Sequence, residues 1–245
     1  MFETYAPLRG SVARIALLAG AAVGGLIASR YFVARRINPG ERLADALLDT
    51  TPLLEGRHHL SDTPEKALAA CASYLIHVAY RATEALGVSG KSEDPVGYSR
   101  THTHPYTQVT ATVLTEATTP DLKYTYAVQI PDVGEVRGTR TVGSLRMSGL
   151  SPVRPITDVV QITLAEGYTA QIETEFEAAD FLVTGRSRLF GAVTLRDNAT
   201  NVGRINIAPD GCVTGTVTRD NRIVGRFEGQ VSTGIHFRQN QIEGA

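Results

Sequence analysis

Two histidines one residue apart, His102 and His104, are the candidates for metal chemistry in this sequence. Alternate residues of a strand share one face, so two imidazoles at this spacing could chelate one ion. The distant histidines that could add a third ligand are His58, His59 and His236. No local spacing supplies that ligand, and Pro105 indicates a strand edge or a loop. We therefore expect two solvated histidines and no metal site, with the pair as a weak candidate.

Three glutamates at alternate positions, Glu173, Glu175 and Glu177, are the candidates for acid–base chemistry. Paired carboxylates can act as general acid and base. Three in a row on the polar face of an amphipathic strand more simply predict a solvated surface. The sequence contains no G-x-S-x-G, Walker A or C-x-x-C motif, and no G-x-G-x-x-G after a strand. We therefore expect no catalytic residues and no cofactor, and a protein that is not an enzyme.

Composition narrows the class of protein further. The chain has 245 residues, of which 42% are hydrophobic, and it contains 24 basic and 25 acidic residues. That apolar content excludes an intrinsically disordered chain. A net charge of −1 argues against nucleic-acid binding, which depends on a basic excess. Cys71 and Cys212 are either free thiols or one pair, and they do not form a disulfide framework.

An apolar segment near the N-terminus predicts a single membrane-spanning helix. Ile15 to Ser29 is a run of fifteen residues without a charge. Fifteen helical residues rise only about 22 Å, whereas the hydrocarbon core of a bilayer is roughly 30 Å thick. Adding Val12, Ala13 and residues 31–34 makes the segment long enough, with the flanking arginines reaching the interface. The residues expected at the membrane interface are Arg14, Arg30, Tyr31, Phe32, Arg35 and Arg36.

Two alternatives are open for this segment. A cleaved signal peptide also has a basic start and an apolar run of this length. Cleavage after Ala28 or Ser29, however, would put Leu26 or Ile27 where a small residue is required. A buried hairpin or a core helix is the second alternative. We favour the uncleaved single-pass anchor.

Small residues recur at every fourth position of the predicted anchor, at Ala16, Gly20, Gly24 and Ala28. On a helix they form one stripe that lets another helix approach closely. The alternative is that glycine and alanine are simply common in membrane helices. We expect a helix-packing face, with a second copy of the chain or another transmembrane subunit as partner, besides the membrane lipids.

The distribution of arginines gives an expected orientation. Two arginines precede the apolar run, and four follow it by Arg42. Under the positive-inside rule this favours a β domain on the cytoplasmic side.

Helical periodicity marks two segments after the anchor. Residues 41–49 carry Leu43, Ala46 and Leu47 on one face, which predicts a short amphipathic helix at the membrane surface. A second helix begins near Thr63 and runs to about Leu86. Its apolar residues form one buried seam, which we expect to pack on the β domain or on a partner.

Alternation with period two begins near Tyr106 and predicts about eight or nine antiparallel strands. Residues 122–130 and 168–176 show it most clearly. Arg-Asp-Asn followed by Val-Gly-Arg occurs twice, in residues 196–204 and 219–226, and indicates successive hairpins of one sheet.

The expected fold is mainly β with N-terminal helices: a single transmembrane helix, amphipathic helices, then an antiparallel β-meander or barrel-like domain. The expected regions are an anchor (1–36), a juxtamembrane connector (37–60), a long helix (61–88), a linker (89–105) and the β domain (106–240).

These features favour a non-catalytic, single-pass accessory or scaffold subunit of a larger membrane complex. The alternative is a membrane-anchored carrier of lipid or another apolar ligand, with a barrel cavity lined by Tyr124, Tyr126, Ile172 and Phe176. If the interior of the β domain is filled, the scaffold hypothesis is favoured. If it contains an open lumen, the carrier hypothesis is favoured. A metal-dependent enzyme at His102 and His104 is the third hypothesis.

Overall fold

The computed structural model describes residues 39–55, 63–86, 95–148, 151–180 and 187–240. Its helices are α2 (Pro39–Asp49), α3 (Pro52–Glu55) and α4 (Pro64–Leu86), with a 3₁₀ turn, η2, at Ala165–Gly167. Its strands are β1 (Ser99–Thr103), β2 (Thr110–Ala117), β3 (Leu122–Ile130), β4 (Gly134–Val142), β5 (Arg146–Ser148), β6 (Ser151–Leu164), β7 (Thr169–Asp180), β8 (Ser187–Asp197), β9 (Val202–Ile207), β10 (Cys212–Arg219), β11 (Arg222–Gln230) and β12 (Gly234–Gln239). The predicted mainly β fold is confirmed.

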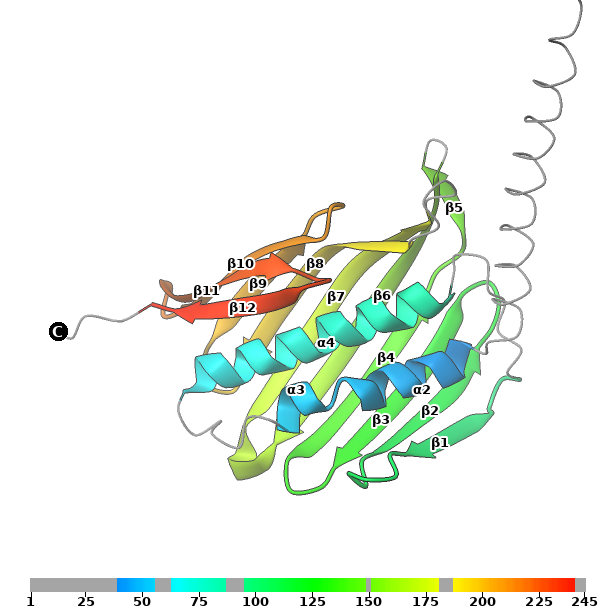
Figure 1. The fold of residues 1–245 in the computed structure, drawn as a ribbon, viewed down its shortest axis with the longest axis horizontal. Helices are drawn as coiled ribbons and strands as arrows, with labels where there is room; N and C mark the ends of the chain where they lie inside the picture. The colour runs from blue at the N-terminus through cyan, green and yellow to red at the C-terminus, as the bar shows by residue number, and fades with distance from the viewer. Residues whose placement is uncertain (1–38, 56–62, 87–94, 149–150, 181–186, 241–245) are drawn as a thin grey trace, which may run out of the picture.

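The strands form one antiparallel sheet of twelve, in which the order follows the chain and β5 is a side strand of β6. The predicted meander is therefore confirmed, although eight or nine strands were too few. The sheet curves strongly, and the helices lie on its concave face (Figure 1). Barrel-like closure was wrong for the described part of the chain, because the end strands β1 and β12 do not pair with each other. The helices occupy the space that a closed barrel would enclose.

The long helix α4 fills the concave side of the sheet. Its N-terminus is capped by Thr63, whose side-chain Oγ1 accepts the N–H of Lys66 at 3.4 Å. Pro64 occupies the first helical position, where a missing N–H is tolerated. The predicted seam is confirmed as far as Ala82, with residues such as Leu68 and Leu75 fully buried. The helix packs on β7, β8 and β12, so its apolar face covers the β domain.

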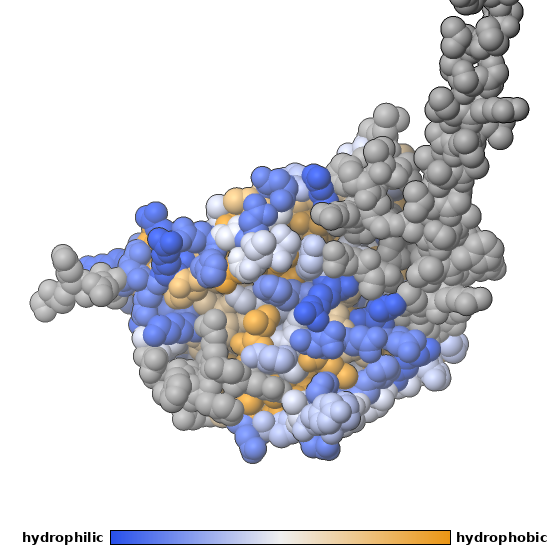
Figure 2. Space-filling model, in the orientation of Figure 1, coloured by the Kyte–Doolittle hydropathy of each residue, from blue (hydrophilic) through white to orange (hydrophobic). Residues whose placement is uncertain are grey.

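Helix α2 has the predicted amphipathic character but a different position. Leu43 and Leu47 are buried in the core, and α2 contacts α4 and the first three strands. The expected placement at a membrane surface was therefore wrong for this apolar face, which covers the sheet instead. The opposite side of α2 is polar, as Figure 2 shows. The helix ends at Asp49, and the hydroxyl of the next residue, Thr50, donates to the Ala46 carbonyl at 2.7 Å.

The apolar residues of the predicted alternating strands point to the concave face of the sheet. Tyr124, Tyr126, Ile172 and Phe176 are each at most 1% exposed. They belong to one hydrophobic cluster with the buried residues of α2 and α4. The side chains expected to line an open lumen are thus core residues beneath the helices.

One boundary differs from the sequence-based expectation. Strand β1 lies within residues 89–105, which the composition assigns to a linker, and pairs with β2. No helix in the described ranges is long and apolar enough to cross a membrane. The predicted anchor, with its small-residue stripe and interface residues, lies outside the described residues.

Cys71 and Cys212 are both free thiols. Cys71 is fully buried in α4, and this burial raises the pKa of its thiol to about 12. We expect iodoacetamide to modify Cys212, which is partly exposed, and to leave Cys71 intact until the protein unfolds. Peptide mapping by mass spectrometry, with and without denaturant, measures both rates. Equal rates in the native protein would contradict the burial of Cys71.

Candidate docking surface

The predicted metal pair lies on the edge strand β1. His102 and His104 face the same side of the strand, toward α2, as their alternation requires. His102 Nδ1 is 3.5 Å from Asp45 Oδ1. His104 Nδ1 accepts the backbone N–H of Thr107 at 3.3 Å, so this ring forms a hydrogen bond within the turn after β1. Both imidazoles are therefore involved in local contacts.

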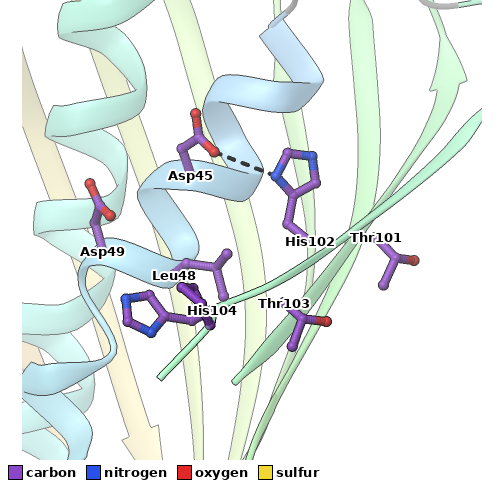
Figure 3. Close-up of a pocket in the computed structure, with 8 residues that line it drawn as sticks. Asp45, Leu48, Asp49, Thr101, His102, Thr103 and His104 are labelled. Atoms are coloured by element: carbon purple, nitrogen blue, oxygen red, sulfur yellow. Dashed lines mark ion pairs between the residues drawn. The ribbon is translucent and has the colours of Figure 1, made fainter. Parts of the chain in front are cut away.

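An open cleft of about 460 Å³ lies between α2 and β1 (Figure 3). Its lining residues are Asp45, Leu48, Asp49, Thr101, His102, Thr103, His104 and Pro105. The rings of His102 and His104 do not converge on a common point in this view. His236, one predicted source of a third ligand, lies on β12 at the other end of the sheet order, and His58 and His59 fall outside the described residues. The described residues hold no group of three side chains suited to a metal ion.

The three candidate acid–base glutamates lie on the convex face of β7. Glu173 and Glu175 are exposed, and neither forms an ion pair with any described residue. Glu177 pairs with Arg146 of β5. Backbone register places Glu173 between Val159 of β6 and Thr194 of β8. The glutamates therefore form a solvated row, and their cross-strand neighbours among the described residues carry no ionisable side chain.

Four exposed arginines gather on the same convex face over the C-terminal strands. This arginine surface consists of Arg196, Arg204, Arg226 and Arg238, from β8, β9, β11 and β12. Register puts Arg204, Arg226 and Arg238 in one row, with Thr216 of β10 between the first two. Arg238 pairs with Glu228, whereas the other three form no ion pair within the described residues. Three uncompensated guanidinium groups thus point away from the domain.

Exposed aliphatic side chains border these charges. Val202 is 46% exposed and lies opposite Arg196, and Ile223 is 43% exposed in the same cross-strand row. Val159, next to Glu173, is 62% exposed. Arginine together with exposed apolar side chains is a common composition for surfaces that dock on other proteins.

Comparison with protein-family models and with curated proteins gives no match for this chain. The functional assignment therefore depends on the geometry of the docking surface and of the contacts that hold it in place.

A polar network fixes the hairpins that carry the arginine surface. Asp197 Oδ1 accepts the N–H groups of Ala199 and Asn201 at 2.9 and 2.8 Å, which closes the β8–β9 turn. Arg219 donates to Asn201 Oδ1 at 3.1 Å and pairs with the buried Glu65 of α4. The repeated Arg-Asp-Asn sequence thus joins two hairpins to each other and to the helix.

A buried ion pair stiffens the central strands from the concave side. Arg140 of β4 donates to both carboxylate oxygens of Asp158 on β6, at 2.8 and 3.0 Å. The Thr174 hydroxyl lies 3.2 Å from Asp158 Oδ2, and it accepts the Asp158 N–H at 2.9 Å. Burial alone would lower the pKa of Arg140, but the Asp158 carboxylate raises it above its ordinary value. Both residues are at most 2% exposed, so the pair is a structural contact rather than a site open to substrate.

The sequence patterns identified the glutamate row but not the arginine surface. Arg204 and Arg226 each follow a Val-Gly dipeptide of the repeat, and the structure places both at exposed positions of their strands. Whether they lie beside each other depends on the pairing register, which the sequence does not specify by itself. The Arg140–Asp158 pair had no sequence signal beyond two charges at inward positions of their strands.

Proposed function

We propose that this protein is a non-catalytic, single-pass membrane scaffold or accessory subunit whose β domain docks on partner subunits through the convex arginine surface. The observation that carries the proposal is that Arg196, Arg204 and Arg226 are exposed on one face and form no ion pair with the described residues. Uncompensated charge on a rigid sheet is well suited to recognise an oppositely charged partner surface. The membrane attachment of the proposal comes from residues 12–34 of the sequence.

The filled interior supports a scaffold over a carrier of apolar ligands. A carrier needs an open apolar lumen that covers most of its ligand. Here the helices α2 and α4 pack on the concave face, and Tyr126 and Phe176 beneath them are 1% exposed. The contacts of His102 and His104 likewise give no support to a metal-dependent enzyme.

The test is the native mass of the full-length protein purified in mild detergent. We expect the wild type to migrate as a larger assembly, and R196E/R204E/R226E to weaken that assembly by about tenfold or more. Arg137→Glu is the matched control, since Arg137 is exposed on the same face but lies on β4 and pairs with Glu135. A strictly monomeric wild type, or a triple variant with an unchanged assembly, would contradict the docking role.

A further inference from the structure

Unpaired charges of both signs lie on the convex face of the sheet. Glu173 and Glu175 project from β7, and Arg204 and Arg226 project from β9 and β11. Strand β8 separates the glutamates from Arg204, a distance of about 10 Å between backbones at the usual strand spacing. The charges therefore face outward without meeting one another, and each set is accessible to a partner outside the described chain.

Three of these charges, Glu173, Arg204 and Arg226, also share one cross-strand row, and Glu175 lies in the adjacent row. The row runs from Val159 through Glu173, Thr194, Arg204 and Thr216 to Arg226 and Arg238. Within this row, Glu173 lies on one side of a line between β8 and β9, and the three arginines lie on the other side. The row is self-complementary, because a two-fold rotation about that line places Glu173 over the arginine half of the row in a second copy.

We propose that a second copy of this chain docks on the convex face, with the two-fold axis parallel to the strands and between β8 and β9. Glu173 then lies over Thr216 of the second copy, between that copy's Arg204 and Arg226. The same contact occurs twice, once on each side of the axis. This inference rests on the proposed docking function and specifies its partner.

The shape of the surface suits this arrangement. Several outward side chains near the proposed axis are short, as at Ala192 and Thr194 of β8 and Asn206 of β9. Short side chains at these positions allow the two sheets to approach where their convex faces meet, with Arg196 and Arg204 beside them on the same two strands. The glutamates of β7, Arg226 of β11 and Arg238 of β12 lie on the flanks, where curvature separates the two faces. An isologous contact of this kind closes as a dimer and does not extend into a filament.

The glutamate row favours a protein partner over an anionic lipid surface. A leaflet rich in anionic lipids attracts arginines but repels carboxylates on the same face. Glu173 and Glu175 lie in adjacent cross-strand rows of that face and are exposed, so lipid docking would bring them toward like charge. A second copy compensates both sets at once.

A charge exchange between two variants tests the dimer. The full-length protein in mild detergent is compared as wild type, as E173R/E175R and as R204E/R226E. We expect each variant alone to self-associate about tenfold or more weakly than the wild type. Mixing the two, with different tags, should restore association to about the wild-type level, because each substituted position of one variant then meets substituted or native residues of opposite charge on the other. Arg137→Glu is the control, and equal thermal stability confirms that every variant is folded.

Cross-linking gives a second readout that is independent of association through the anchor. In a Cys212→Ser background, Glu173→Cys on one tagged copy and Thr216→Cys on another should form an intermolecular disulfide on mild oxidation. Arg137→Cys with Thr216→Cys should not, since Arg137 projects from β4, away from the proposed contact. Equal cross-linking of both pairs would overturn the proposed register.

Other outcomes separate this inference from the docking function. If the mixed variants associate no better than either alone, the second copy is not the partner. If a larger assembly with a single copy persists and still depends on the arginines, the docking function holds and the dimer is wrong. Flotation with phosphatidylserine vesicles, compared with phosphatidylcholine vesicles, tests the lipid alternative. Arginine-dependent flotation without self-association would assign the surface to the membrane instead.

Discussion

Replacing Arg140 with leucine is expected to lower the free energy of unfolding by about 3–5 kcal/mol. The substitution leaves the Asp158 carboxylate at 0% exposure without its counterion, although the Thr174 hydroxyl still donates to it. A buried charge without its counterion costs much more than the net contribution of the intact pair. Urea denaturation of the full-length protein in detergent, followed by circular dichroism, measures the change.

Two further variants identify the cause of that loss. Arg137→Leu removes an arginine from the same strand, but its side chain is 71% exposed, so we expect a change within about 0.5 kcal/mol. The double variant R140L/D158L removes both charges and should recover most of the stability. A loss below about 1 kcal/mol in the Arg140→Leu variant would show that Asp158 does not depend on this guanidinium group.

The second large effect is expected at Gly191 of β8. Its backbone has φ of +142°, and a side chain there would collide with the Glu175 carbonyl and lie 2.9 Å from Phe176 Cα. Gly191→Ala therefore combines an unfavourable backbone conformation with a clash against the neighbouring strand, and we expect it to cost about 2–5 kcal/mol. Because β8 borders the proposed two-fold axis and β7 carries the glutamates of the proposed contact, the same change should also weaken self-association.

Gly167→Ala is the matched control for this prediction. Gly167 also has a positive φ, +78°, but an added Cβ meets no atom within 4 Å. The Gly167→Ala substitution should lower the free energy of unfolding by only about 1 kcal/mol, which is the cost of the unfavourable backbone conformation alone. Thermal unfolding of both variants distinguishes the two contributions, and equal losses would argue against a steric clash at Gly191.

Elements that depend on local patterns could be predicted from the sequence. The Thr63–Pro64 start and the seam through Leu68 and Leu75 define α4, because capping and helical periodicity act over a few residues. The alternation around Tyr124 and Tyr126 defines β3 and its buried face for the same reason. A meander follows from short turns between such strands, and the order of the sheet follows the chain.

Features that depend on contacts between distant segments could not be predicted. The apolar face of α2 has the pattern of a membrane-surface helix, and only the sheet beneath it shows that the face is covered. Strand β1 alternates polar residues on both faces, so hydrophobic periodicity does not reveal it. The curvature of the sheet without closure into a barrel depends on where the helices pack against it.

The docking surface was missed for a related reason. Each arginine occupies an ordinary outward position of its own strand, and register alone brings Arg204 and Arg226 into one row. The glutamates were visible because they alternate within a single strand, β7. Patterns within a strand can be read from the sequence, whereas patterns across strands require the pairing.

Photo-cross-linking in native membranes tests the central claim, that the convex face docks on another protein chain. A photoreactive phenylalanine analogue replaces Thr216, at the centre of the arginine row, or Ser232 in the exposed β11–β12 turn as a control. We predict that the probe at position 216 captures another polypeptide, that the control does not, and that the R204E/R226E background abolishes the capture. Cross-links confined to the same chain at position 216, or equal capture at both positions, would contradict a docking role for this face.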